Sequence, residues 1–159
     1  MHNRERGRDI EARVRDFLIE RGLEPLASNW RCRVGEIDLV MRDPAPLPEL
    51  PAERRGTVVF VEVRYRRHHA LGGGLASVDA RKRARLRRAA LAWLQRHGDI
   101  DRPARIDVVA VGPRTPDTAS CTAATDRARG AGDGEGNPIA DLAPDLRLEW
   151  VVDAVAGDA

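Results

Sequence analysis

Apolar residues recur in residues 9–21 with the period of an amphipathic helix. The positions i, i+4, i+7 and i+8, which share one face of a helix, are Ile10, Val14, Phe17 and Leu18. Gly22 follows and is expected to end the helix, because glycine readily adopts the left-handed conformation found after helix C-termini. The pattern therefore predicts a helix that packs on the rest of the protein through one apolar face.

Two later segments, residues 34–41 and 57–66, have the composition of buried strands. Successive side chains of a strand point to opposite faces, so each segment divides into two sets. The sets of the first segment are Ile37, Leu39 and Met41, and Glu36, Asp38 and Val40. The sets of the second segment are Val59, Val61, Val63 and Tyr65, and Val58, Phe60, Glu62, Arg64 and Arg66. Carboxylates thus fall among apolar side chains in both predicted strands.

A second amphipathic helix is expected to end near Gly98, after a capping residue that is either Ser77 or Asp79. Its apolar face consists of Leu86, Ala90, Trp93 and Leu94. Further strands are expected over residues 106–111 and 146–152, and an additional strand is expected near residues 26–33.

Two segments have the composition of flexible loops. Residues 43–56 contain four prolines, and residues 113–144 are rich in Gly, Ala, Pro, Asp and Thr. Taken together, the predicted helices and strands indicate an α/β protein with a mixed central sheet flanked by helices on both faces. The length of 159 residues fits a single domain over residues 1–159.

Charged residues are unevenly distributed, although the net charge is only +2. Residues 99–159 contain 6 arginines against 12 acidic residues, a balance of −6, so the preceding part carries +8. A polyanion such as nucleic acid is expected to bind that preceding part. Cys32 and Cys121 are the only cysteines, and no apolar run approaches the roughly 18 residues of a membrane span. These features predict a cytoplasmic protein without a membrane partner.

Asp38 and Glu62 lie inside strongly apolar strands, where an uncompensated carboxylate is costly. Two strands joined by a loop would naturally pair antiparallel, which can bring these carboxylates side by side. Together they would form a hard-oxygen site suited to Mg²⁺ or Mn²⁺. Arg64, on the same face as Glu62, can reach a phosphate at that metal. The alternative is an ordinary buried salt bridge between Arg64 and one of the carboxylates.

Four segments, in this order, resemble the motifs of the YraN family, a group of small bacterial proteins. They are Gly35-Glu36-Ile37-Asp38-Leu39-Val40, Phe60-Val61-Glu62-Val63-Arg64-Tyr65-Arg66, Gly72-Gly73-Gly74 with Ser77-Val78, and Arg105-Ile106-Asp107-Val108-Val109. That family is similar to archaeal Holliday-junction resolvases and other PD-(D/E)XK nucleases. The resemblance implies a restriction-endonuclease-like fold in which Asp38 and Glu62 bind the metal.

Two further acidic residues enter through the same resemblance. Glu11 matches the helix-borne acidic residue of the resolvases and shares a stripe with apolar residues of the first helix, which makes it a third metal-ligand candidate. The alternative is a surface carboxylate stabilised by the helix dipole. For Asp107 a structural ion pair with an arginine is favoured over a role in the site.

Arg64 stands at the position where active nucleases of this kind normally have lysine. A desolvated lysine can lose its proton and help to activate water, whereas arginine stays charged and can only position or stabilise a phosphate. Lys82 is the single lysine among 27 basic residues and is aligned with the core-facing stripe of its helix. We therefore hypothesise that Lys82 supplies the missing amine, the alternative being a lysine that extends along the helix edge to solvent.

Arginines around this predicted site favour nucleic-acid binding through phosphate contacts. The candidates are Arg66, Arg67, Arg81, Arg83, Arg85 and Arg88. Metal-dependent endonuclease action on DNA, including branched DNA, is the leading hypothesis, and DNA is favoured over RNA as the substrate. The competing hypothesis is a nucleic-acid-binding or assembly module that retains the fold without useful catalysis. A homodimer is compatible with either hypothesis.

Overall fold

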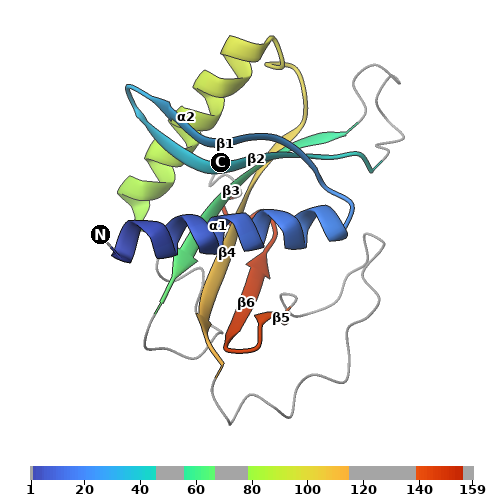
Figure 1. Ribbon diagram of the computed structural model, residues 1–159. Helices are drawn as coiled ribbons and strands as arrows, with labels where there is room; N and C mark the ends of the chain where they lie inside the picture. The colour runs from blue at the N-terminus through green and yellow to red at the C-terminus, as the bar shows by residue number, and fades with distance from the viewer. Residues whose placement is uncertain (1, 46–55, 67–78, 115–138, 156–159) are drawn as a thin grey trace.

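The computed structural model describes residues 2–45, 56–66, 79–114 and 139–155. Six strands form one mixed sheet with the order β1-β2-β3-β4-β6-β5, in which only β3 and β4 are parallel neighbours. The elements are α1 (His2–Glu20), β1 (Glu24–Cys32), β2 (Gly35–Asp43), β3 (Thr57–Tyr65), α2 (Ala80–His97), β4 (Ala104–Pro113), β5 (Ile139–Ala143) and β6 (Leu146–Val151). The helix α2 therefore lies in the crossover that parallel neighbours require (Figure 1).

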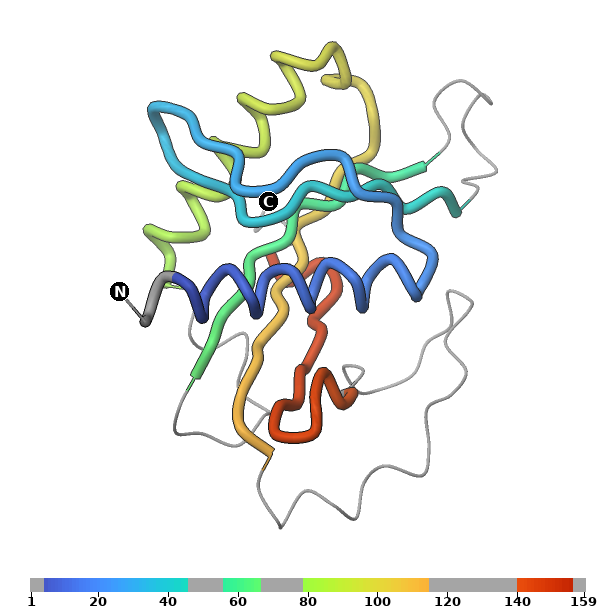
Figure 2. The backbone as a smooth tube through the Cα atoms, viewed as in Figure 1, coloured from blue at the N-terminus to red at the C-terminus, as the bar shows by residue number. Residues whose placement is uncertain are grey.

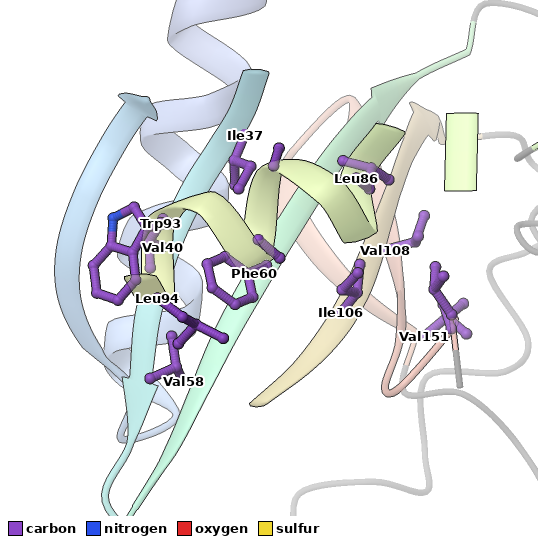
Figure 3. Packing of buried hydrophobic residues seen from close by; sticks show 14 residues of the cluster. Ile37, Val40, Val58, Phe60, Leu86, Trp93, Leu94, Ile106, Val108 and Val151 are labelled. Carbon is purple, nitrogen blue, oxygen red and sulfur yellow. The ribbon is translucent and has the colours of Figure 1, made fainter. Parts of the chain in front are cut away.

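In the part of the chain that the structure describes, one helix covers each face of the sheet, because the strands alternate between two apolar faces. The α2-side core joins α2 to the inner strands through residues that include Val40, Phe60 and Val108 (Figure 3). The α1-side core joins α1 to residues such as Met41, Val61 and Val109. The predicted fold class is confirmed: the protein has the mixed sheet, with helices on both faces, of the restriction-endonuclease-like fold.

The helix α2 begins and ends as its sequence predicts. Asp79 is the N-cap, and its side chain accepts a hydrogen bond of 2.7 Å from the Lys82 backbone N–H. Gly98 is the C-cap with φ of 73°, a left-handed conformation that glycine adopts without steric cost. Between the caps, Trp93 packs edge to face on Phe60 with ring centroids 5.8 Å apart. These contacts fix the axial position of the first turn of α2, which carries Lys82.

The helix α1 crosses the opposite face of the sheet (Figure 2). It extends over His2–Glu20, whereas the apolar period predicts only residues 9–21, because its first two turns are polar. The predicted apolar stripe is confirmed: Ile10, Val14 and Leu18 are all buried. No helix among the described residues is both long and apolar enough to cross a membrane.

Two predictions about local structure were wrong. Residues 139–143 form β5 and pair with β6, although they fall inside the loop predicted over residues 113–144. The strand has only five residues and follows a segment rich in Gly, Ala, Asp and Thr, so pattern analysis missed it, and pairing with β6 supplies the order. Residues 115–138 of that predicted loop, and residues 46–55 of the other predicted loop, lie outside the described residues.

The second wrong prediction concerns the faces of β2. Ile37 was expected to share a face with Leu39 and Met41, yet it packs in the α2-side core, whereas Leu39 and Met41 pack in the α1-side core. The register pairs of β2 with β3 run from Asp43↔Thr57 to Leu39↔Val61. Asp38 therefore stands where the paired region ends, and strict alternation is broken at that residue.

Candidate metal and phosphate site

Asp38 occupies the point at which the paired region of β2 and β3 ends. One residue beyond the last register pair, its Oδ2 atom accepts a hydrogen bond of 2.8 Å from the backbone N–H of Val63. The carboxylate thus takes the place of a strand carbonyl as the partner of β3, which satisfies a backbone donor. This bond fixes Asp38 beside Glu62, the residue that precedes Val63.

Glu62 lies on the α2 face of β3 and is 5% exposed. Its Oε1 atom forms a short ion pair with the ammonium of Lys82, from the first turn of α2. The Nε atom of Arg64 is 3.7 Å from the same oxygen, beyond hydrogen-bond distance. The structure thus brings the Lys82 ammonium to Glu62, and Lys82 is the closer of the two cations, while its role in the site stays a prediction.

The electrostatics of Asp38 are unusual for an aspartate. Its pKa is raised from 3.8 to about 7, mainly by burial and also by the neighbouring carboxylates of Glu62 and Glu11, against the opposing effects of the Val63 N–H and Lys82. Negative charges are therefore crowded at this point, and Asp38 titrates near neutrality. Perturbation of this kind, caused by burial together with like charge, is typical of functional sites.

Glu11 approaches the pair from the α1 side of the sheet. It acts electrostatically on Asp38, and its Oε2 atom is buried with no hydrogen-bond partner among the described residues. A buried carboxylate oxygen without a partner is costly in a protein that offers nothing to compensate it. A cation between the carboxylates would remove that cost.

A pocket of about 400 Å³ opens over this site between β2, β3 and the first half of α2. Its polar lining consists of Glu36, Asp38, Glu62, Lys82 and Arg85. Carboxylates and basic side chains therefore share one concave surface. Such a surface can hold a divalent cation at one end and a phosphate at the other.

The carboxylates present fit Mg²⁺ or Mn²⁺. Both ions prefer oxygen ligands, and Mg²⁺ usually keeps several waters while bound through one or two carboxylates. Asp38 and Glu62 are the residues that would hold the ion. Across residues 2–45, 56–66, 79–114 and 139–155, no three His, Cys, Asp or Glu side chains are grouped closely enough to form a metal cage. Glu11 is thus an electrostatic neighbour of the pair, and its role as a third ligand stays a prediction.

The predicted phosphate-binding arginines fall into separate groups. At 100° per residue, Arg81, Arg85 and Arg88 share one flank of α2, and Arg85 lines the pocket. Arg83 lies on the other flank, away from that stripe. Arg66 directly follows β3 and donates its backbone N–H to the Val111 carbonyl, whereas Arg67 lies outside the described residues.

Asp107 has a structural role and forms the ion pair with an arginine that the sequence analysis favours. It is completely buried and accepts hydrogen bonds from the Arg105 guanidinium, from Trp150 Nε1 at 3.0 Å and from the Asp153 backbone N–H. Burial raises its pKa despite these donors. Arg105 also binds Asp43, so this network joins β2, β4 and β6. Its partners Trp150 in β6 and Asp153 just after β6 lie far along the chain, and no sequence pattern indicates them.

Comparison with known proteins identifies the family. Residues 10–111 match the model of uncharacterised protein family UPF0102, which is the YraN family. The chain belongs to this family. A UPF0102 protein of Halorhodospira halophila is 51% identical over 107 residues, 67% of this chain and 77% of the relative. A UPF0102 protein of Stutzerimonas stutzeri is 50% identical over 106 residues, 66% of this chain and 79% of the relative.

The residues that match the UPF0102 model form the part of the fold that contains the pocket. It extends from α1 to β4 and therefore includes every element that contributes to the pocket, whereas β5 and β6 lie beyond it. A UPF0102 protein of Methylobacillus flagellatus shows a similar coverage, with 44% identity over 111 residues, 70% of this chain and 87% of the relative. The suspected family membership is thus confirmed, and the relatives are bacterial.

Proposed function

We propose that this UPF0102 protein is a metal-dependent endonuclease that hydrolyses phosphodiester bonds in DNA, including branched DNA. The observation that carries the proposal is the pair of carboxylates at the end of the β2–β3 pairing, of which Glu62 is buried and Asp38 is half-buried. Asp38 has a pKa raised to about 7 by burial and by Glu62, and both residues line a pocket that also contains basic side chains. An ordinary salt bridge explains Glu62 alone, but it leaves the Glu11 Oε2 atom without a hydrogen-bond partner among the described residues and Asp38 with a raised pKa.

The chain's own residues divide the work as follows. Asp38 and Glu62 would hold the divalent cation, and the bound cation would supply activation of water and stabilisation of negative charge on the phosphate. Lys82 and Arg64 place positive charge next to the scissile phosphate. Arginine stays protonated, so Arg64 can only position or stabilise. Lys82 is the residue that can also take part in proton transfer.

DNA is held mainly through its backbone in this proposal. Arg81, Arg85 and Arg88 share one side of α2, from which Arg85 lines the pocket, and phosphate contacts of this kind are strongly salt-dependent and largely independent of sequence. Such a protein acts in the cytoplasm, where bacterial DNA is found, without a membrane partner. A homodimer would present two pockets to the two sides of a branched substrate.

The second candidate is a nucleic-acid-binding or assembly module with the same fold. Arg64 favours it, because a guanidinium replaces the lysine that active nucleases of this kind carry on the strand. The two candidates share DNA binding and differ in cleavage.

A cleavage assay separates them. Linear, junction and flap DNA would be incubated with the protein across a titration of Mg²⁺ or Mn²⁺, with Asp38→Asn as the matched variant. The nuclease proposal predicts metal-dependent nicks that disappear in Asp38→Asn. Metal-independent DNA binding without cleavage under any of these conditions would instead support the binding module.

A further inference from the structure

Lys82 is already paired with one of the proposed metal ligands. Its ammonium contacts Glu62 Oε1, and the Glu62 side chain is only 6% exposed. The Lys82 side chain is itself 37% exposed, so it reaches this carboxylate from the solvent side of the pocket. Its backbone is anchored by Asp79, whose carboxylate caps α2 at Lys82 N. The backbone of Lys82 is thus fixed by the helix cap, whereas its long side chain is flexible and partly exposed.

A divalent cation and an ammonium cannot bind the same carboxylate oxygen at close range without strong repulsion. The Lys82 ammonium is a compact charge with three donors, and it lies near enough to Asp38 to lower that residue's pKa. It therefore compensates, at least in part, for the negative charge that a metal would neutralise. The Arg64 guanidinium is farther from Glu62, with its Nε atom at 3.7 Å.

We infer that Lys82 is an internal counter-ion of the Asp38–Glu62 pair, and that divalent-cation binding requires its displacement from Glu62. This inference rests on the proposed metal site. The four-carbon stem allows the ammonium to swing toward the pocket mouth while the helix cap stays in place. Breaking the Lys82–Glu62 pair costs free energy, which makes the free energy of metal binding less favourable. The released amine becomes available to a phosphate. Metal binding and amine position are therefore coupled.

The test is calorimetric titration of the full chain with Mn²⁺ at about pH 8, for wild type, Lys82→Gln and Arg64→Gln. Lys82→Gln is expected to bind Mn²⁺ about tenfold more tightly than wild type, a factor that corresponds to about 1.4 kcal/mol. Arg64→Gln removes the same charge near the same carboxylate but not the close pair, so its gain is expected to be clearly smaller. Without metal, Lys82→Gln is expected to melt below wild type, and Mn²⁺ is expected to raise its Tm by more.

Each outcome decides between the claims. The counter-ion inference is overturned, and the metal site stays intact, if wild type binds Mn²⁺ and Lys82→Gln binds it no more tightly. The same conclusion follows if Arg64→Gln gains as much Mn²⁺ affinity as Lys82→Gln. Absence of Mn²⁺ binding by all three proteins overturns the metal site and the inference together. Lys82→Arg covers the case in which Lys82→Gln does not fold. It keeps a cation at Glu62, so it is expected to bind Mn²⁺ no more tightly than wild type, and tighter binding would contradict the inference.

Discussion

Asp38→Asn is expected to stabilise the metal-free protein, most strongly above neutral pH. The substitution keeps the size of the side chain and an oxygen that can accept the hydrogen bond from Val63. It removes the charge that burial and Glu62 make unfavourable. A residue that serves a functional site often lowers the stability of the fold, so its replacement can raise the free energy of unfolding.

The magnitude follows from the pKa of Asp38, which burial raises from 3.8 to about 7. Between these values the folded protein keeps a proton that the unfolded chain loses, so the free energy of unfolding falls as pH rises. Each pH unit in this window corresponds to about 1.4 kcal/mol. The full loss is roughly 4 kcal/mol, reached above about pH 7, and roughly 2–3 kcal/mol of it develops between about pH 5 and pH 8.

Urea unfolding of wild type and Asp38→Asn in the presence of a chelator measures this difference. The advantage of the variant should grow by roughly 2–3 kcal/mol from about pH 5 to pH 8. Asp16→Asn is the matched control, because it removes an exposed carboxylate on α1 and should keep the wild-type pH dependence. A variant that is less stable than wild type at the higher pH, or a difference that does not change with pH, would refute the reasoning.

Three further predictions concern the scaffold, each measured as a change in the free energy of unfolding in urea. Phe60→Ala should cost about 3–5 kcal/mol, because Phe60 is 1% exposed at the centre of the α2-side core. Gly56→Ala should cost about 1–3 kcal/mol, because φ is 91° and an added Cβ would lie 2.9 Å from the Asp43 carbonyl oxygen. Trp150→Phe should cost about 1–3 kcal/mol, because it removes a donor to the buried Asp107. A cost below about 0.5 kcal/mol, which is typical of surface substitutions, would contradict the corresponding account.

Much of the fold could be predicted, since its strongest signals are local. The α2 helix has an apolar stripe, a capping aspartate and a terminal glycine within one short segment, and all three features act as expected. The strand β5 could not be predicted, because residues 139–143 owe their order to pairing with β6. The change of face after Ile37 was also hidden, because it depends on where β2 and β3 stop pairing.

The site was predictable to the extent that its residues contradict their surroundings. Carboxylates in apolar strands indicated Asp38 and Glu62, and a lone lysine among arginines indicated Lys82. The structure places these three residues in one pocket. Sequence spacing could not show that Arg85 lines the pocket, nor that Glu62 pairs more closely with Lys82 than with Arg64. Such details depend on how helix and strand are packed together.

The central claim is that Asp38 and Glu62 form a divalent-metal site, and direct binding of Mn²⁺ tests it without assuming catalysis. Calorimetric titration would compare wild type with Asp38→Asn and Glu62→Gln, each shown to be folded by circular dichroism. Saturable Mn²⁺ binding by wild type that is lost in both variants is the predicted result. Equal Mn²⁺ binding by all three proteins, or no binding by wild type, would contradict the account.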